Sequence, residues 1–257
     1  MAKVRIRGFD LHYEMRGQGY PVVLIHHLAG NLSSWRFQIP ELSKHFKVVA
    51  YELRGHGDSE SVETGYSIKD QTEDLVALLK QLNLQQTHVV GHSIGGSIAL
   101  NFAIQHPQLL GRVVAVAPPL EPASKEGLAE NKRLLAIAKE KGMEAVAEAR
   151  RNILPKKLTG DEELWSGFKK TYGMTSILGY EKTLEASANM PPIAQELSKI
   201  QNPVLGISGD LDALAPNLNI MATKIPNFKA VVMVGCGHFP TLENTVEFNR
   251  NLTNFLL

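Results

Sequence analysis

The chain has 257 residues and a formal net charge of +1, and its composition is 44% hydrophobic and 21% charged. That length fits one α/β domain, or one domain with a large insertion, and the composition is that of an ordinary soluble globular protein. The near-neutral charge, with no run of lysine or arginine, argues against a nucleic-acid-binding protein.

Targeting signals do not stand out in the sequence. Residues 1–7 are basic, but no apolar segment of signal-peptide length follows them. The apolar run 22–25 is far too short to cross a bilayer. Cys236 is the single cysteine and cannot form an internal disulfide, so nothing indicates an oxidising compartment. We therefore expect a cytoplasmic protein without membrane contacts, either a monomer or a homodimer.

The first 117 residues alternate between strand and helix patterns. Segments 3–7 and 11–15 alternate in polarity on either side of a turn, which predicts a β-hairpin. Continuous apolar runs predict strands that are covered on both faces, at 21–25, 46–51, 87–90 and 113–116. Between these strands, helices are predicted after a capping box at 67–70 and over 93–105.

The alternation is interrupted between residues 118 and about 200, where no convincing strand pattern is found. Helical patterns take its place, at 125–151, 161–172 and 176–188. The first is broken near Gly142, and the second follows a capping box formed by Thr159 and Glu162.

Strands return at 203–207 and 230–234, and a helix at 245–256 closes the chain. Alternating strands and helices imply an α/β fold with a mostly parallel central sheet of about eight strands, flanked by helices. We therefore expect a core formed by residues 1–117 and 201–257. Residues 118–200 would be a helical cap, or lid, inserted after the sixth strand.

A G-x-S-x-G pattern occupies residues 91–95, with Ser93 at its centre. The pattern alone is weak, but here it directly follows an apolar run and directly precedes a helical pattern. A nucleophilic serine on such a strand–turn–helix bend needs small residues two positions to either side. The helix start also directs free N–H groups at developing negative charge. Ser93 is therefore the predicted nucleophile, and the alternative is an ordinary turn with a helix-capping serine.

A serine nucleophile needs a base within hydrogen-bond reach, and on this type of bend the chain order is serine, acid, histidine. Two histidines follow Ser93. His106 lies at the end of the next predicted helix, whereas His238 lies in a glycine-flanked loop after the apolar run 230–234. Because such a loop displays an exposed imidazole, His238 is the predicted base.

The acid that orients the histidine should also follow a strand. Asp210 and Asp212 both follow the predicted strand 203–207, and Asp161 in the helical insertion is a third, more distant candidate. We favour Asp212, because Asp210 is placed to bond its own backbone in a turn. The acid would hold the imidazole in the correct tautomer and stabilise the imidazolium.

Five motifs in this order resemble those of the α/β-hydrolase superfamily of serine hydrolases. They are the oxyanion loop 24–30, the turn 51–59 with Glu52 where the family has Asp, the serine turn 91–95, the acid turn 209–212 and the histidine loop 237–238. The likeness covers the predicted core segments and implies the α/β-hydrolase fold. It also favours Asp212 over Asp210. Loop 28–30 is somewhat similar to that of 3-oxoadipate enol-lactonases.

The resemblance implies roles for residues around the serine. The backbone N–H groups of Leu28 and Ile94 would form the oxyanion hole. His27 stands where the family has Gly, and it either reaches toward substrate or simply packs on the cap or faces solvent. His26 is expected to brace the oxyanion loop, and His92 to be structural.

The helical insertion should roof the site and give it a largely apolar pocket. Candidate lining residues, each of which has core packing as the alternative, are His27, Trp165, Phe168, Tyr172, Met174, Ile177, Met190 and Phe239. No metal or cofactor is expected, since no cluster of metal ligands is evident in the sequence.

The predicted activity is hydrolysis of a small to medium-sized, uncharged or weakly polar carboxylic ester through an acyl-enzyme on Ser93. A lactonase or a C–C bond hydrolase would use the same three residues. A small-molecule receptor with little turnover is the alternative from a different class. A perhydrolase is less favoured, because the Trp and Met usual in that group are Leu28 and Ile94 here. Ser93 also disfavours dehalogenases and epoxide hydrolases, whose nucleophile is Asp.

Overall fold

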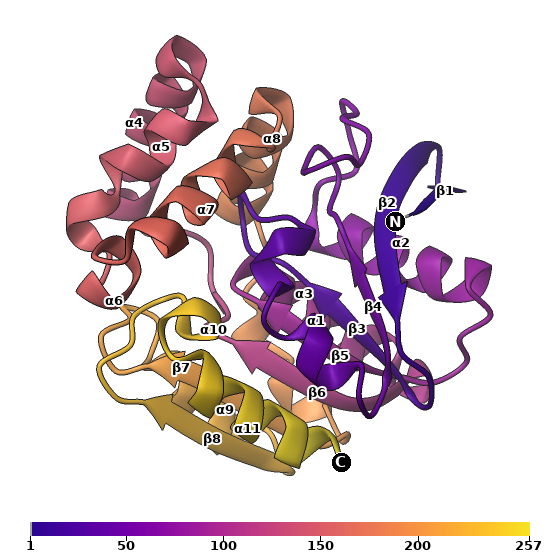
Figure 1. Ribbon diagram of the computed structural model, residues 1–257. Coiled ribbons are helices and arrows are strands. Elements are labelled where there is room, and N and C mark those ends of the chain that lie inside the picture. The colour runs from indigo at the N-terminus through magenta and orange to yellow at the C-terminus, as the bar shows by residue number, and fades with distance from the viewer. Residues whose placement is uncertain (1) are drawn as a thin grey trace.

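A single eight-stranded sheet forms the centre of the computed structural model, which describes residues 2–257 (Figure 1). The strands are β1 (Ala2–Ile6), β2 (Phe9–Arg16), β3 (Pro21–Ile25), β4 (Lys47–Tyr51), β5 (Thr87–His92), β6 (Leu110–Val116), β7 (Val204–Gly209) and β8 (Phe228–Met233). Their order in the sheet is β1-β2-β4-β3-β5-β6-β7-β8. β2 pairs antiparallel with β1 and with β4, and every other neighbouring pair is parallel.

Helices connect the strands and also fill the long segment between β6 and β7. They are α1 (Ile39–Leu42), α2 (Ile68–Gln81), α3 (Ile94–Gln105), α4 (Lys125–Lys141), α5 (Met143–Ala149), α6 (Lys156–Thr159), α7 (Glu162–Gly173), α8 (Ile177–Ala188), α9 (Asn217–Lys224), α10 (Pro240–Glu243) and α11 (Thr245–Leu256). Figure 1 shows α4, α5, α7 and α8 gathered in one group on one side of the molecule. The predicted fold class is therefore confirmed.

Alternate side chains of the central strands enter two separate apolar cores. On one face, Val23 and Ile25 of β3 pack with residues of α2, α3 and α9. On the other face, Val22 and Leu24 pack with residues of α1 and α11. Since successive side chains of a strand point to opposite faces and both faces are covered, the strand sequence is a continuous apolar run.

A third apolar cluster joins the cap helices to the core. Residues of α4, α5, α7 and α8 pack there with Ala29, from the loop after β3, and with Phe239 and Leu242, which lie just beyond His238. The group of helices between β6 and β7 therefore rests directly on the loops that carry the candidate functional residues. No helix within residues 2–257 is long and apolar enough to span a membrane.

The starts and ends of some cap helices differ from the sequence-based expectation. The break at Gly142 is confirmed, and this residue has a left-handed φ of 82°. The capping box at Thr159 is wrong, because Thr159 ends α6. α7 begins behind Asp161 instead, whose carboxylate accepts the N–H groups of Glu163 and Leu164, each at 3.0 Å. A carboxylate at that position also faces the positive end of the helix dipole.

A buried ion pair fastens the turn after β4 to helix α2. Arg54 donates from Nε and Nη2 to the two carboxylate oxygens of Asp74, at 2.6 and 2.7 Å. The two side chains are only 6% and 4% exposed, so neither charge has an alternative partner in water. This bidentate geometry is the strongest form of such a pair.

Replacing Asp74 by Ala should be strongly destabilising, because it leaves the Arg54 charge buried and unpaired. We expect the free energy of unfolding to fall by about 3–5 kcal/mol in urea denaturation. The matched control is Lys44→Ala, which removes an exposed pair with Glu41 and should cost under about 1 kcal/mol. Equal losses in the two variants would contradict the assigned role of the buried pair.

Candidate active site

Ser93 lies on a sharp bend between β5 and α3, with a left-handed φ of 54° and ψ of −119°. Only glycine fits two positions to either side of it. A Cβ atom on Gly91 would lie 1.9 Å from the Gly95 carbonyl oxygen, and one on Gly95 would lie 2.4 Å from the Ile25 carbonyl oxygen. Both distances are far below van der Waals contact, so the G-x-S-x-G spacing is a steric requirement of the bend.

Ser93 borders a cavity of about 190 Å³ between the core and the cap. Five other residues that the sequence singles out also line it: His27, Leu28, Tyr172, His238 and Phe239. The cap completes the wall with residues that the sequence did not indicate: Glu130, Asn131, Leu134, Arg150, Ile153 and Tyr180. Residues from three distant parts of the chain therefore meet around one small space.

Asp212 and His238 lie in contact beside this cavity. The Nδ1 atom of His238 is 2.9 Å from Oδ2 of Asp212, whose side chain is only 5% exposed. With Nδ1–H donated to the carboxylate, the other ring nitrogen, Nε2, is free to accept a proton. Within residues 2–257, Ser93 and His238 share the cavity without a direct hydrogen bond. Such bonds are often long until substrate binds.

The two candidate aspartates of the acid turn have different partners. Burial alone would raise the pKa of Asp212, but the hydrogen bonds and charge of His238, together with the Leu214 N–H group, outweigh it and lower that pKa. Asp212 therefore stays ionised beside the imidazole. Asp210 accepts the N–H of Gly235 at 2.7 Å and so closes a turn. Asp161, the third candidate, caps α7 as described above.

Two side chains that the sequence did not single out for this role hold the His238 loop in place. The buried carboxylate of Glu243 accepts the N–H of Gly237 at 2.6 Å and that of Phe239 at 2.9 Å. His92 donates from Nε2 to the His238 carbonyl oxygen at 2.6 Å. The backbone on both sides of the imidazole is therefore anchored. The position of Glu243, two residues before the closing helix, was the only available signal for it.

The two predicted oxyanion-hole groups lie at adjacent strand ends. Ile25 of β3 pairs in register with Gly91 of β5, so the loops that follow them are neighbours. The loop after β3 turns sharply at Ala29, with a left-handed φ of 57°. Among the hydrogen bonds of residues 2–257, none uses the backbone N–H of Leu28 or Ile94. Both donors are therefore free for a developing negative charge.

The histidines of this loop are buried and act as neutral hydrogen-bonding groups. His26 donates from Nδ1 to the His27 carbonyl oxygen at 2.7 Å and accepts the Leu53 N–H at Nε2, 3.0 Å away, so its predicted bracing role is confirmed. His27 is also buried, and its ring packs on Phe239 with centroids 5.0 Å apart. It therefore faces the cavity and the cap, not solvent.

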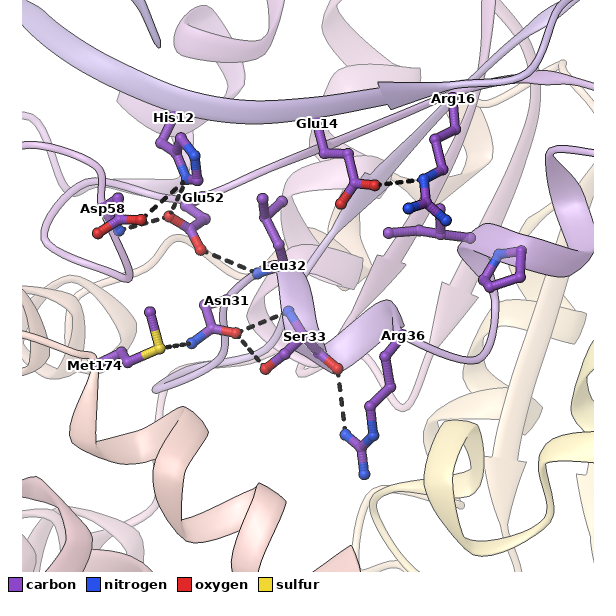
Figure 2. A pocket seen from close by; sticks show the side chains of 12 residues that line it. His12, Glu14, Arg16, Asn31, Leu32, Ser33, Arg36, Glu52, Asp58 and Met174 are labelled. Carbon is purple, nitrogen blue, oxygen red and sulfur yellow. Dashed lines mark hydrogen bonds and ion pairs between the residues drawn. The ribbon is translucent and has the colours of Figure 1, made fainter. Parts of the chain in front are cut away.

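Glu52, which replaces the family's Asp, braces the same loop from behind. Its buried carboxylate accepts the N–H of Leu32 at 3.2 Å, the N–H of Asp58 at 2.6 Å and Nδ1–H of His12 at 2.8 Å. Figure 2 shows the carboxylate between these partners, on the wall of a separate cavity of about 400 Å³. The carboxyl group of Glu52 lies over Gly57, where a Cβ atom would come within 2.1 Å of the carboxyl carbon.

The group of His12, Glu52 and Asp58 could in principle hold a metal ion, since one ligand atom of each lies within 4.8 Å of the others. Figure 2 shows that the Glu52 carboxylate is instead bonded to His12 and to the Asp58 backbone N–H group, whereas the exposed Asp58 carboxylate lies 3.9 Å from His12 Nδ1. We therefore interpret the cluster as a structural brace of the loop.

Five of the predicted pocket residues do not line the cavity that Ser93 borders. Met174 and Ile177 are exposed, and Met174 lines the separate cavity of about 400 Å³ instead. Trp165 and Phe168 are fully buried behind its wall, with ring centroids 5.6 Å apart. Met190 packs with α3 residues in the core on one face of the sheet. The expectation that these five side chains would form the wall is corrected on this point. Large apolar side chains at helical spacing here fill the cap core.

Known proteins resemble this chain along nearly its whole length. The family model for the alpha/beta hydrolase fold matches residues 20–245. A putative carbamate hydrolase of Serratia proteamaculans is 31% identical over 263 residues, covering 96% of each chain. The enol-lactonase of Burkholderia xenovorans LB400 superposes with a TM-score of 0.91 at 27% identity, covering 99% of each chain. A carboxylesterase structure from Nitrososphaera gargenis gives a TM-score of 0.90 at 29% identity, covering 99% of this chain and 97% of that one.

Replacing Gly91 by Ala tests the steric requirement of the serine bend. The new methyl group would overlap the Gly95 carbonyl oxygen. We therefore expect the free energy of unfolding, measured by urea denaturation, to fall by more than about 3 kcal/mol. Gly127→Ala is the matched control. A Cβ atom there meets nothing closer than 3.4 Å, so that variant should be unchanged or slightly more stable. A Gly91→Ala protein of full stability would contradict the close approach.

The buried histidines predict acid-sensitive stability. Burial lowers the pKa of His92 to about 3 and that of His56 to about 4, and it holds the pKa values of His26 and His27 well below their usual value. The unfolded chain takes up these protons near pH 6.5, whereas the folded chain does not. Stability is therefore fully present above that pH and is lost as the pH falls.

We expect the free energy of unfolding to fall by at least about 2 kcal/mol per pH unit between pH 6 and 5, in urea titrations at each pH. His56→Gln should reduce this slope, because the variant removes the contribution of close to one proton taken up on unfolding. The exposed His45, replaced by Gln, should leave it unchanged. A stability that does not change over this interval would rule out neutral buried histidines.

Proposed function

Because this chain belongs to the α/β hydrolase fold family, we propose that it is a serine esterase that cleaves a small to medium-sized carboxylic ester through an acyl-enzyme on Ser93. The observation that carries this proposal is the position of His238. Its Nδ1 atom contacts the ionised Asp212 at 2.9 Å, and the same ring borders the cavity that Ser93 lines. A base held in one tautomer beside a strained serine is the arrangement that acyl transfer needs.

In the first half of the reaction, Ser93 Oγ attacks the ester carbonyl carbon while Nε2 of His238 takes the hydroxyl proton. Asp212 remains a carboxylate and stabilises the imidazolium that forms. The carbonyl oxygen becomes an oxyanion between the N–H groups of Leu28 and Ile94. Each such donor contributes about 3 kcal/mol to the transition state. The imidazolium then gives its proton to the leaving alcohol, and the C–O bond breaks.

In the second half, water attacks the acyl-enzyme with His238 again acting as the base. The oxyanion forms at the same two N–H groups, and its collapse releases the acid and restores the Ser93 hydroxyl. Since water and acyl group must share a cavity of about 190 Å³, we expect a short acyl chain to be preferred. The buried side chains of Glu243 and His92 would keep the imidazole in place through both halves.

A lactonase is the second candidate, and the overlap of this chain with an enol-lactonase over 99% of both chains favours it. A lactone is an intramolecular ester, so each step above applies without change, except that the leaving alcohol stays attached. A C–C bond hydrolase would also use the same residues on a different carbonyl. A receptor of this fold would bind such molecules with little turnover.

Ester turnover and covalent labelling together test this proposal. We expect the protein to hydrolyse p-nitrophenyl acetate and butyrate and to be labelled by a fluorophosphonate at Ser93. Ser93→Ala should abolish labelling and lower kcat/KM by at least about 10⁴-fold. Asp212→Asn should lower kcat by about 10³–10⁴-fold. Asp210→Asn is the matched control and should keep most of the activity, since Asp210 only closes a turn.

The other outcomes separate the rival functions. Labelling of Ser93 without turnover of simple esters would favour the C–C bond hydrolase. Absence of both labelling and turnover would favour the receptor and overturn the proposed activity.

A further inference from the structure

A cationic side chain of the cap borders the same cavity as Ser93. Arg150 lies at the end of α5 and lines the cavity of about 190 Å³, together with Ser93 and His238. It also lines an adjoining cavity of about 420 Å³. The two cavities share Arg150, Ile153 and His238 on their walls. Arg150 therefore stands where one space meets the other, on the side of the cap.

The guanidinium of Arg150 has no acidic partner within the part of the chain that the structure describes. It donates from Nη1 to the Tyr172 hydroxyl at 2.8 Å, and no carboxylate oxygen of residues 2–257 lies within 4.0 Å of it. Glu130 is the acidic residue of the same cavity wall, and Arg133 already binds both of its oxygens at 2.7 Å. An arginine carries five N–H donors and is always charged, so most of its donors remain available.

Tyr172 fixes the direction in which this charge points. Its ring lies in the buried cap cluster, 4.9 Å from that of Phe168 and 6.5 Å from that of His27, centroid to centroid. Since the Tyr172 hydroxyl holds Nη1, the rest of the planar guanidinium is held in position at the cavity wall. A partly buried cation that is positioned by a neutral group and has no carboxylate oxygen within 4.0 Å is available to bind an anion.

We propose that Arg150 binds a carboxylate of the substrate, so that the ester or lactone cleaved at Ser93 also carries an acidic group. This inference rests on the proposed function. It replaces the expectation of an uncharged substrate, which was based on the aromatic and methionine side chains of the cap. The planar guanidinium matches a carboxylate with two parallel hydrogen bonds, which lysine cannot reproduce.

A pair of esters of equal length tests the inference. p-Nitrophenyl hemiglutarate and p-nitrophenyl valerate have the same acyl chain, except that the first ends in a carboxylate. We expect kcat/KM to favour hemiglutarate by at least about 10-fold in the wild type. Arg150→Met should lower kcat/KM for hemiglutarate by about 100-fold and that for valerate by less than about 3-fold. Arg150→Lys should recover only part of the loss.

Arg151→Met is the matched control. Arg151 is the next residue of the cap and pairs with Glu148 and Glu162, and it does not line the cavity. Its loss removes the same charge, so the ratio of the two kcat/KM values should stay at the wild-type level. A wild-type protein that does not prefer hemiglutarate, or an equal loss for both esters in Arg150→Met, would overturn the inference and leave the proposed esterase activity intact.

A binding measurement keeps the two proposals separable. Glutarate and its neutral analogue glutaramide can be titrated calorimetrically into Ser93→Ala protein, which cannot turn over substrate. We expect glutarate to bind at least about 10-fold more tightly than glutaramide, and this preference to disappear when Arg150→Met is added. An unchanged preference in the double variant would refute the role of Arg150, whatever the outcome of the ester assays.

Discussion

The close approach of the serine bend to the neighbouring strands is the constraint on which the whole site depends. Gly95 lies so near β3 that a methyl group there would come within 2.4 Å of the Ile25 carbonyl oxygen. On the other side, the Ser93 N–H donates to the Val116 carbonyl oxygen of β6 at 2.8 Å. These contacts hold Ser93 at a φ of 54°, a conformation that costs an L-residue about 1–3 kcal/mol and persists only where its surroundings enforce it.

Because β3, β5, β7 and β8 run parallel, their carboxyl ends lie at one edge of the sheet, and the loops that follow them meet there. This brings His238 to Ser93 across 145 residues of sequence, and Asp212 reaches the far side of the imidazole. The loops are anchored individually, by Glu52 behind the oxyanion loop and by Glu243 beneath the histidine loop. The cap helices then close the space above and add Arg150 to its wall.

The fold, and the meeting of Ser93, Asp212 and His238 at one edge of the sheet, were predictable because their signals are local. A strand buried on both faces is a continuous apolar run, and the order of serine, acid and histidine follows from strand ends that are recognisable in sequence. The choice between Asp210 and Asp212 needed the family resemblance, since both follow the same strand. The structure gives the two residues separate partners, Gly235 for Asp210 and His238 for Asp212.

Other features were beyond sequence reasoning because they depend on contacts between distant segments. Helices α1 and α10 have only four residues each, too few to show a helical period. Trp165 and Phe168 have the same apolar spacing whether they face the pocket or the cap interior. Arg150 looked like any charge on a helix surface, and only folding of the cap shows that Glu130, its acidic neighbour in the cavity wall, is bound to Arg133.

The most direct measurement is a crystal structure of the protein after reaction with a p-nitrophenyl alkylphosphonate. The adduct should be bonded to Ser93 Oγ, with one phosphonyl oxygen within about 3 Å of the Leu28 and Ile94 N–H groups and with Nε2 of the His238 ring facing the bonded oxygen. An adduct on another residue would contradict the central claim that a strained serine, a buried aspartate and a loop histidine act as one unit. So would a phosphonyl oxygen that points away from both N–H groups.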